Sequence, residues 1–321
     1  MRVLLWHVHG SWTTAFVQGE HDYLVPVLED RGPDGRGRAR TWDWPETVNE
    51  LTPEELADAD FDLVILQRPS DEELCEAWTG RRPGRDVPAI YVEHNAPQGP
   101  IAEMDHSARD RDDLLVCHVT HFNGLFWDCG TTRTRVIEHG VVDPGERYSG
   151  ELKRGAVVVN EARRRGRVTG TDLLQRFEDG GVGLDLFGMD AAALGGIEDL
   201  PQGRLHDEMA RRRVYVHPMR WTSLGLSLIE AMHLGMPIVA LATTEAVEAV
   251  PPAAGTVSTQ PAVLVDAARA FLDDPEAARD AGRAARAFAL ERYGLGRFLT
   301  DWDRLMEEVA SSAHRLGLRA R

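Results

Sequence analysis

The chain of 321 residues has 36 Lys and Arg against 52 Asp and Glu, a net charge of −16 at pH 7. Nucleic acids and anionic membrane surfaces both attract clustered positive charge, so this balance argues against either partner, but a small phosphate site remains compatible with it. At roughly 100–200 residues per domain, the length predicts two domains.

Targeting and redox signals are weak. No run of about 18 uncharged apolar residues occurs, so no membrane-spanning segment is predicted. The apolar start of the chain is interrupted by His7 and His9, which makes it a poor signal peptide. The three cysteines Cys75, Cys117 and Cys129 are odd in number and show no CxxC spacing, so no disulfide framework or zinc site is implied. We expect a cytoplasmic protein.

Short apolar runs rich in Val, Ile and Leu alternate with amphipathic stretches along the chain. The first series predicts strands at Val3–Val8, Asp62–Leu66, Ala89–Glu93, Leu114–Val119 and Val136–Glu138. The second series predicts strands at Ala156–Val159, Gly183–Phe187, Val214–His217 and Ile238–Ala242, with helices at Thr171–Phe177, Arg204–Arg212 and Ser227–Leu234. Apolar strands alternating with helices indicate parallel sheets buried on both faces. The fold class predicted is therefore α/β, with two doubly wound domains.

Two segments define the organisation of these domains. The stretch Asp143–Gly150 has the turn chemistry of a linker between the two strand series. The stretch Gly296–Leu316 carries apolar residues at helical spacing and predicts a long amphipathic helix that must dock on another element.

Polar residues directly after the strands are the first candidates for a site, because ligands of open α/β sheets bind beyond the carboxyl ends of the strands. These loops contain four histidines and several small polar residues. They are His9-Gly10-Ser11, His94-Asn95, Thr120-His121, His139-Gly140, Asn160-Glu161, Gly188 and Pro218–Ser223.

The most informative segment is VYVHPMRWTSLGLSLIEAMHLGMPIVAL, at Val214–Leu241. A strand ends at His217-Pro218, a helix begins near Gly225–Ser227, and Gly235 with Pro237 ends that helix. The helix N-terminus offers free N–H groups and a positive dipole end to a phosphate. Glu230, about one turn further on, can accept hydrogen bonds from a sugar diol.

This segment resembles the donor-site signature of the retaining, family 4 (group 1) glycosyltransferases with a GT-B fold. The resemblance is carried by Glu230 with Gly225, Leu226, Ala231, Met232, Gly235 and Pro237. Three other segments resemble the family more weakly and follow one another along the chain as they do in the family. They are the VIEHGVVD stretch at Val136–Asp143, Arg204–Met209 and Asp273–Tyr293.

The resemblance implies two Rossmann-like domains that face each other across a cleft. Residues 1–146 would form the acceptor-side domain, joined by a C-terminal helix at 297–321 that crosses back. Residues 147–296 would bind the nucleotide sugar. Such enzymes need no obligatory metal, so neither a metal nor another cofactor is expected. The expected partners are a nucleotide sugar and an acceptor, and a homodimer is left open.

The resemblance also implies roles for individual residues. His94 would reach the donor sugar near the reaction centre, Glu230 would bind the ribose hydroxyls, and Gly10 would let the diphosphate or acceptor approach. Backbone amides near Leu226–Ser227 would hold the diphosphate. The full set of donor contacts expected is Gly10, Arg164, Arg167, Thr169, Thr222, Ser223, Leu224, Gly225, Leu226 and Ser227. The acceptor-side residues expected are Ser11, Trp12, His121 and Asn123.

Two positions depart from the family pattern. Thr222 stands where the family has a first Glu, and a hydroxyl cannot supply the same charge-assisted hydrogen bonds to the donor sugar. The family's phosphate-binding Lys is replaced by Thr169, and the chain's single lysine is Lys153. An arginine must then stabilise the leaving phosphate, and Arg164, Arg165 and Arg167 are the alternatives, with Arg165 taken as the catalytic one.

The predicted function is transfer of a sugar from a nucleotide-diphosphate sugar to a hydroxyl-type acceptor, with retention of the anomeric configuration. Two other functions fit the same pattern: a GT-B-fold sugar-nucleotide epimerase, and a degenerate glycosyltransferase that acts as a binding subunit because of Thr222. Ordinary structural roles are the alternative for single residues. Glu230 would then be a solvated surface carboxylate, and the arginines at 163–167 a solvated loop.

Overall fold

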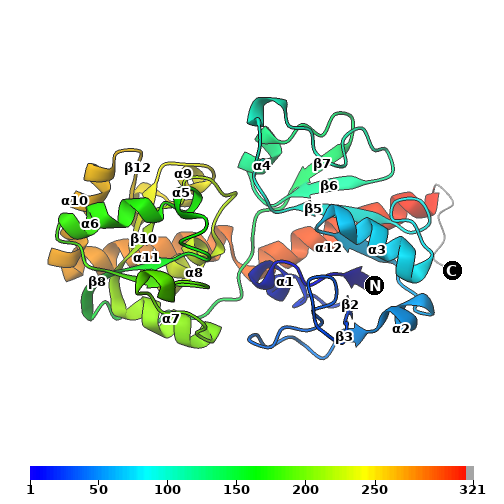
Figure 1. Cartoon of the computed structure of the whole chain (residues 1–321), viewed down its shortest axis with the longest axis horizontal. Helices are drawn as coiled ribbons and strands as arrows, with labels where there is room; N and C mark the ends of the chain where they lie inside the picture. Colours follow the sequence, from blue (N-terminus) through cyan, green and yellow to red (C-terminus); the bar gives the residue numbers. More distant parts are fainter. Residues whose placement is uncertain (316–321) are drawn as a thin grey trace. The chain divides into compact units, whose positions relative to one another are not determined.

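The chain forms two compact units in the computed structural model, which describes residues 1–315 (Figure 1). The first unit comprises Met1–Gly140 and the segment that begins at Leu295, and the second is Val141–Gly294. The boundary at Gly140 falls shortly before the one expected at 146, so the stretch expected to be a linker lies in the second unit. The end of the expected crossing helix, 316–321, lies outside the described residues.

The first unit is built on a seven-stranded parallel sheet with the order β3-β2-β1-β4-β5-β6-β7. The order reverses between β1 and β4, as in doubly wound folds. The strands are β1 (Arg2–Leu5), β2 (Asp22–Pro26), β3 (Val48–Leu51), β4 (Leu63–Leu66), β5 (Ala89–Glu93), β6 (Leu115–His118) and β7 (Arg133–Val136).

Helices connect these strands and begin at local capping signals. Thr52 and Glu55 form a capping box at the start of α2, and the hydroxyl of Thr120 accepts a hydrogen bond from the amide of Asn123 at the start of α4. The helices are α1 (Gly10–Phe16), α2 (Pro53–Ala57), α3 (Pro69–Thr79), α4 (His121–Phe126) and α12 (Leu295–Arg315), with a 3₁₀ turn η1 (Ile101–Glu103).

The second unit has a five-stranded parallel sheet with the order β12-β11-β10-β8-β9. Here the order reverses at β8, which lies between β9 and β10. The strands are β8 (Leu152–Val158), β9 (Leu184–Phe187), β10 (Arg212–His217), β11 (Ile238–Leu241) and β12 (Gly255–Ser258). The helices are α5 (Gly166–Thr169), α6 (Leu174–Asp179), α7 (Gln202–Arg211), α8 (Leu226–Leu234), α9 (Ala246–Ala249), α10 (Pro261–Asp273) and α11 (Pro275–Arg292), with 3₁₀ turns η2 (Thr171–Leu173), η3 (Ala192–Leu194) and η4 (Pro252–Ala254).

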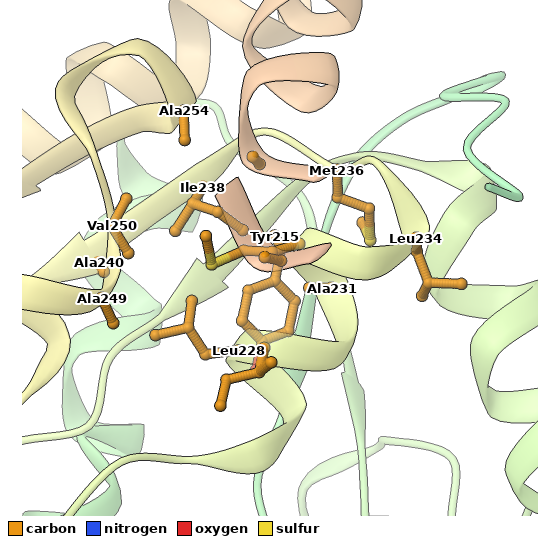
Figure 2. Close-up of a cluster of buried hydrophobic side chains, with 14 of the residues drawn as sticks. Tyr215, Leu228, Ala231, Leu234, Met236, Ile238, Ala240, Ala249, Val250 and Ala254 are labelled. Atoms are coloured by element: carbon orange, nitrogen blue, oxygen red, sulfur yellow. The ribbon is translucent and has the colours of Figure 1, made fainter. Parts of the chain in front are cut away.

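Each unit has its own apolar core. In the second unit the ring of Tyr215 on β10 lies among aliphatic side chains of α8 and β11, such as Leu228 and Ile238 (Figure 2). In the first unit Trp302 of α12 packs edge-on against Trp12 and Phe16 of α1, with ring centroids 5.6 and 5.1 Å away. The amphipathic C-terminal helix therefore packs within the first unit.

The α/β class and the parallel sheets are confirmed, with differences in single elements. The last strand of the first unit is Arg133–Val136 and not Val136–Glu138, because β7 is an exposed, polar edge strand without an apolar run. The strands β2, β3 and β12 were not predicted. All three cysteines are free and buried. Among residues 1–315, no helix is both long and apolar enough to cross a membrane.

Candidate functional site

The second unit brings two loops together at the carboxyl edge of its sheet. The loop after β8 contains α5, and the loop after β10 leads into α8. Since β8 and β10 are neighbours at the point where the strand order reverses, the crevice beyond them is the usual ligand position of such sheets.

Backbone contacts join these two loops. The amides of Arg220 and Trp221 both donate to the carbonyl of Val168, at 2.8 and 3.3 Å. Gly170 lies at the contact with φ +73°, and a Cβ there would stand 1.8 Å from the carbonyl oxygen of Pro218. Glycine is therefore required both by the backbone conformation and by the close approach of the loops.

The three arginines expected to hold a phosphate differ in their partners. Arg164 donates from Nε to the Glu161 carboxylate at 2.7 Å, and Arg167, 81% exposed, contacts Asp172 at 3.4 Å. Arg165 is half-buried at the start of α5. Its guanidinium has no hydrogen bond or ion pair with the described side chains, those of residues 1–312, or with the backbone of residues 1–315. Of the three, Arg165 therefore keeps its donors available for a ligand.

Arg220 is a further cation at this position that the sequence prediction missed. Its Nη1 donates to the carbonyl of Arg167 at 2.9 Å and contacts the Asp172 carboxylate, to which Nη2 donates at 3.0 Å. This fork lowers the pKa of Asp172. The sequence did contain a signal for Arg220, because this residue lies in the loop Pro218–Ser223, one of the candidate loops that follow strands.

The helix α8 begins and ends where the sequence predicted. Gly225 is its N-cap and Gly235, with φ +86°, its C-cap. A Cβ on Gly225 would stand 2.7 Å from Cε1 of His217, so the ring of the strand-end histidine packs directly under the start of the helix. The first turn of α8 is fixed to β10, because the Tyr215 hydroxyl donates to Oγ of Ser227 at 2.9 Å. The start of α8 therefore offers free helical amides, and the loop that leads into it contacts the loop after β8.

Glu230 is buried, with 4% of its surface exposed, so it is not a solvated surface carboxylate. Its Oε2 accepts a hydrogen bond from Nε2 of Gln202 at 3.0 Å and lies 3.4 Å from Nε2 of His206. Gln202 and His206 also contact each other, at 2.9 Å. The sequence prediction missed this polar contact between α7 and α8, which orients the carboxylate.

The other expected donor contacts divide by burial. Thr169, Ser223 and Leu224 are buried, and the hydroxyl of Thr169 lies 2.7 Å from that of Thr171, so these residues build the loops. The partly exposed members of the set are Thr222, Gly225, Leu226 and Ser227.

The first unit gathers histidines at the carboxyl edge of its own sheet. The rings of His9, after β1, and His94, after β5, stack with centroids 4.0 Å apart, and Trp12 contacts His94 edge-on at 5.0 Å. A Cβ on Gly10 would come no nearer than 3.9 Å to any atom, so this unit by itself does not require glycine there.

Burial keeps these histidines neutral. It lowers the pKa of His9 to about 4 and that of His139 to about 3, and it holds the pKa of His94 well below its usual range, with His9 and His139 adding to the effect. Neither ring nitrogen of His139 has a hydrogen-bond partner within the described part of the chain. At neutral pH the cluster therefore offers polar ring atoms without charge.

The expected acceptor-side residues are not equally accessible. Trp12 is fully buried in the aromatic core, where it contacts His94, so its side chain offers no exposed surface to an acceptor. Asn123 is also buried, and its Nδ2 donates to the carbonyl of Glu93 at 3.2 Å. Ser11 is partly exposed, and His121 is exposed. Among the side chains that the structure describes, those of residues 1–312, no group of three or more His, Cys, Asp or Glu is placed to hold a metal ion.

Comparison with known proteins matches the site-bearing segment to a family. Residues 197–288 match the model of the family described as "Glycosyl transferases group 1". This segment contains α7, the loop after β10, and α8 with Glu230. The comparison with curated proteins finds no match.

Solved structures share the fold at low sequence identity. Sucrose-phosphate synthase from Thermosynechococcus elongatus has a TM-score of 0.74 and 14% identity, over 97% of this chain and 100% of that chain. HepE from Anabaena in complex with UDP has a TM-score of 0.66 and 12% identity, over 96% and 100%. A glycosyltransferase from Rickettsia africae has a TM-score of 0.61 and 12% identity, over 96% and 98%. Residues 197–288 are therefore similar to the group 1 glycosyltransferases, and the chain shares the GT-B fold of these solved structures.

Proposed function

We propose that the chain transfers a sugar from a nucleotide-diphosphate sugar to a hydroxyl-bearing acceptor, with retention of the anomeric configuration. One observation carries the proposal: the available guanidinium of Arg165, the amides at the start of α8 and the oriented carboxylate of Glu230 lie on segments that follow β8 and β10, the neighbouring strands at the strand-order reversal of the second unit. A cation and helix amides suit a diphosphate, and a carboxylate suits a ribose diol.

In this proposal the departing diphosphate carries the charge that develops during the reaction. Arg165 and the α8 amides stabilise that charge, while the sugar passes through an oxocarbenium-like state. The donor phosphate takes the proton of the acceptor hydroxyl. His94 stays neutral and offers a polar ring atom to the sugar. No step of this scheme uses a metal or another cofactor.

The donor is tested first by thermal shift with UDP, GDP, ADP and dTDP and their sugars. UDP leads the panel because HepE is described in complexes with UDP and UDP-glucose. A nucleotide at 100 times its dissociation constant stabilises the native protein by about 2.7 kcal/mol. Glu230→Gln, which keeps the side-chain volume, should lose most of this shift. If no nucleotide raises the melting temperature, the proposed function is wrong.

Retention is tested on the first sugar released from a bound donor. NMR of the anomeric proton, recorded before mutarotation, should show the same configuration as the donor, and the opposite configuration would exclude retention. Thr222 favours one alternative, a binding subunit without turnover, because a hydroxyl replaces a sugar-binding carboxylate. A donor that binds but releases no nucleoside diphosphate with any acceptor would support that alternative. Epimerisation of the donor without an acceptor would instead indicate an epimerase.

A further inference from the structure

The first unit contains a pocket of about 630 Å³ that the proposed donor site does not use. One wall runs from η1 to Asp105, and the other is the end of α4 with the residues up to Asp128. The lining residues are Ile101–Asp105 and Leu125–Asp128. Both walls follow strand ends, those of β5 and β6, and the volume lies in the range of small-molecule sites.

Hydrogen bonds hold the two walls together. The backbones of Asp105 and Asp128 form an isolated β-bridge, and the amide of His106 donates to the carbonyl of Asp128 at 2.9 Å. The indole of Trp127 donates from Nε1 to the carbonyl of Asn95 at 2.7 Å. Asn95 follows His94 in the chain, so the pocket wall is tied to the residue next to the proposed sugar-contacting histidine.

Part of the pocket lining is apolar and aromatic. Phe126 and Trp127 contribute aromatic rings, and Leu125, with 79% of its surface exposed, extends the apolar surface into solvent. Exposed aromatic and aliphatic groups in a concave site bind the apolar faces of small ligands, and aromatic faces also attract cations.

The charged side chains of the pocket are all acidic. Glu103, Asp105 and Asp128 line it, together with no lysine or arginine. Arg109, outside the lining, donates to Asp105 at 2.6 Å and also contacts Asp128 and Asp110, so one cation faces three carboxylates. Glu103 is exposed and has no ion pair in the described part of the chain. The pocket therefore repels phosphate and attracts ammonium groups.

We propose that this pocket binds the acceptor, and that the acceptor is an amine-bearing sugar or cyclitol. The aromatic and aliphatic wall takes the ring, the carboxylates accept hydrogen bonds from its hydroxyl and ammonium groups, and phosphorylated acceptors are excluded. This inference rests on the proposed function and adds the chemical class of its second substrate.

The test uses three probes that share one ring and differ in charge: glucosamine, glucose and glucose 6-phosphate. Saturation-transfer NMR on the full chain should show glucosamine bound about 3-fold more tightly than glucose, and glucose 6-phosphate unbound. High salt should reduce the preference for glucosamine. Glu103→Gln should reduce it as well, whereas the matched control Glu20→Gln, at an exposed site outside the pocket, should leave it unchanged.

A second variant tests the apolar wall. Phe126→Ala should weaken binding of both glucosamine and glucose without changing the melting temperature, because its ring is partly exposed. The proposal is overturned if glucosamine does not bind, if glucose 6-phosphate binds as tightly, or if Glu103→Gln and Glu20→Gln behave alike. Because these probes contain no nucleotide, such a failure is separate from a failure of the thermal-shift test of the donor.

Discussion

At the scale of single residues, the proposed donor site combines one side chain that is fixed by hydrogen bonds within the protein with one whose donors are available to a ligand. Glu230 is buried and oriented by Gln202, whereas Arg165 is half-buried and uncommitted. The sequence pattern predicted both residues as members of the donor site. It left open which arginine faces a ligand, because that depends on acidic partners such as Glu161 and Asp172 that only the folded loops bring together.

Arg165→Ala should weaken binding of the nucleoside diphosphate. Hydrogen bonds to a charged group contribute about 2 kcal/mol, which corresponds to roughly 30-fold in the dissociation constant. Calorimetric titration measures the change. The matched control is Arg163→Ala, an exposed arginine of the same loop, which should bind nearly as the native chain does. Equal effects of the two substitutions would mean that only the general charge of the loop matters.

Buried histidines make folding stability depend on pH. Burial lowers the pKa of His9, His118 and His217 each to about 4, from an ordinary value of 6.5. The unfolded chain therefore takes up protons first as the pH falls, and stability is lost through the window from 6.5 down to about 4. As the pH falls from about 7.5 to about 5.5, each of these histidines should lower the free energy of unfolding by roughly 1.3 kcal/mol.

This loss should be unequal between the units, since His9 and His118 lie in the first and His217 in the second. Urea unfolding at the two pH values, followed by hydrogen exchange in each unit, measures it. The decrease in the free energy of unfolding should be at least about twice as large in the first unit as in the second. A free energy of unfolding that is flat across this range would show that folding does not lower the pKa values of these histidines.

At the scale of elements, the sequence predicted the central strands and failed mainly at the sheet edges. β4 and β5 are buried along their whole length, so each gives a continuous apolar run. β7 is exposed at Arg133, Thr134 and Arg135, and an edge strand of this kind has no apolar pattern to detect. β2 is the exception, because its buried Tyr23–Val25 run was a usable signal.

Gly170 is predicted to be essential for joining the two loops of the second unit. Gly170→Ala places a Cβ against the Pro218 carbonyl as well as straining the backbone, so it should destabilise the second unit and weaken nucleotide binding. Gly181→Ala is the matched control, because Gly181 has φ +80° with no atom within 4 Å of a Cβ. The control should cost only about 1–2 kcal/mol. Urea unfolding with and without nucleotide compares them, and equal costs would show that the loop contact is adaptable.

At the scale of the whole molecule, the chain returns to its first unit after completing the second. The amphipathic pattern predicted that the last helix docks, and its partners, Trp12 and Phe16, are known only from the fold. Trp302→Ala removes a side chain that is 1% exposed and should destabilise the first unit by about 3–5 kcal/mol.

The control for this substitution is Arg304→Ala, on an exposed position of the same helix, which should change stability by less than about 0.5 kcal/mol. Hydrogen exchange resolves the two units. Trp302→Ala should raise exchange across Met1–Gly140 and leave Val141–Gly294 unchanged. Equal increases in both units would mean that the two unfold as one.

The most direct test of the central claim is hydrogen exchange with and without the nucleoside diphosphate that gives the largest thermal shift. The proposed donor site predicts protection in residues 164–172 and 218–230, the loop after β8 and the segment that leads into α8. The Arg165→Ala variant should lose this protection. A nucleotide that protects neither segment, or that protects only residues of the first unit, would contradict the assignment of the donor site.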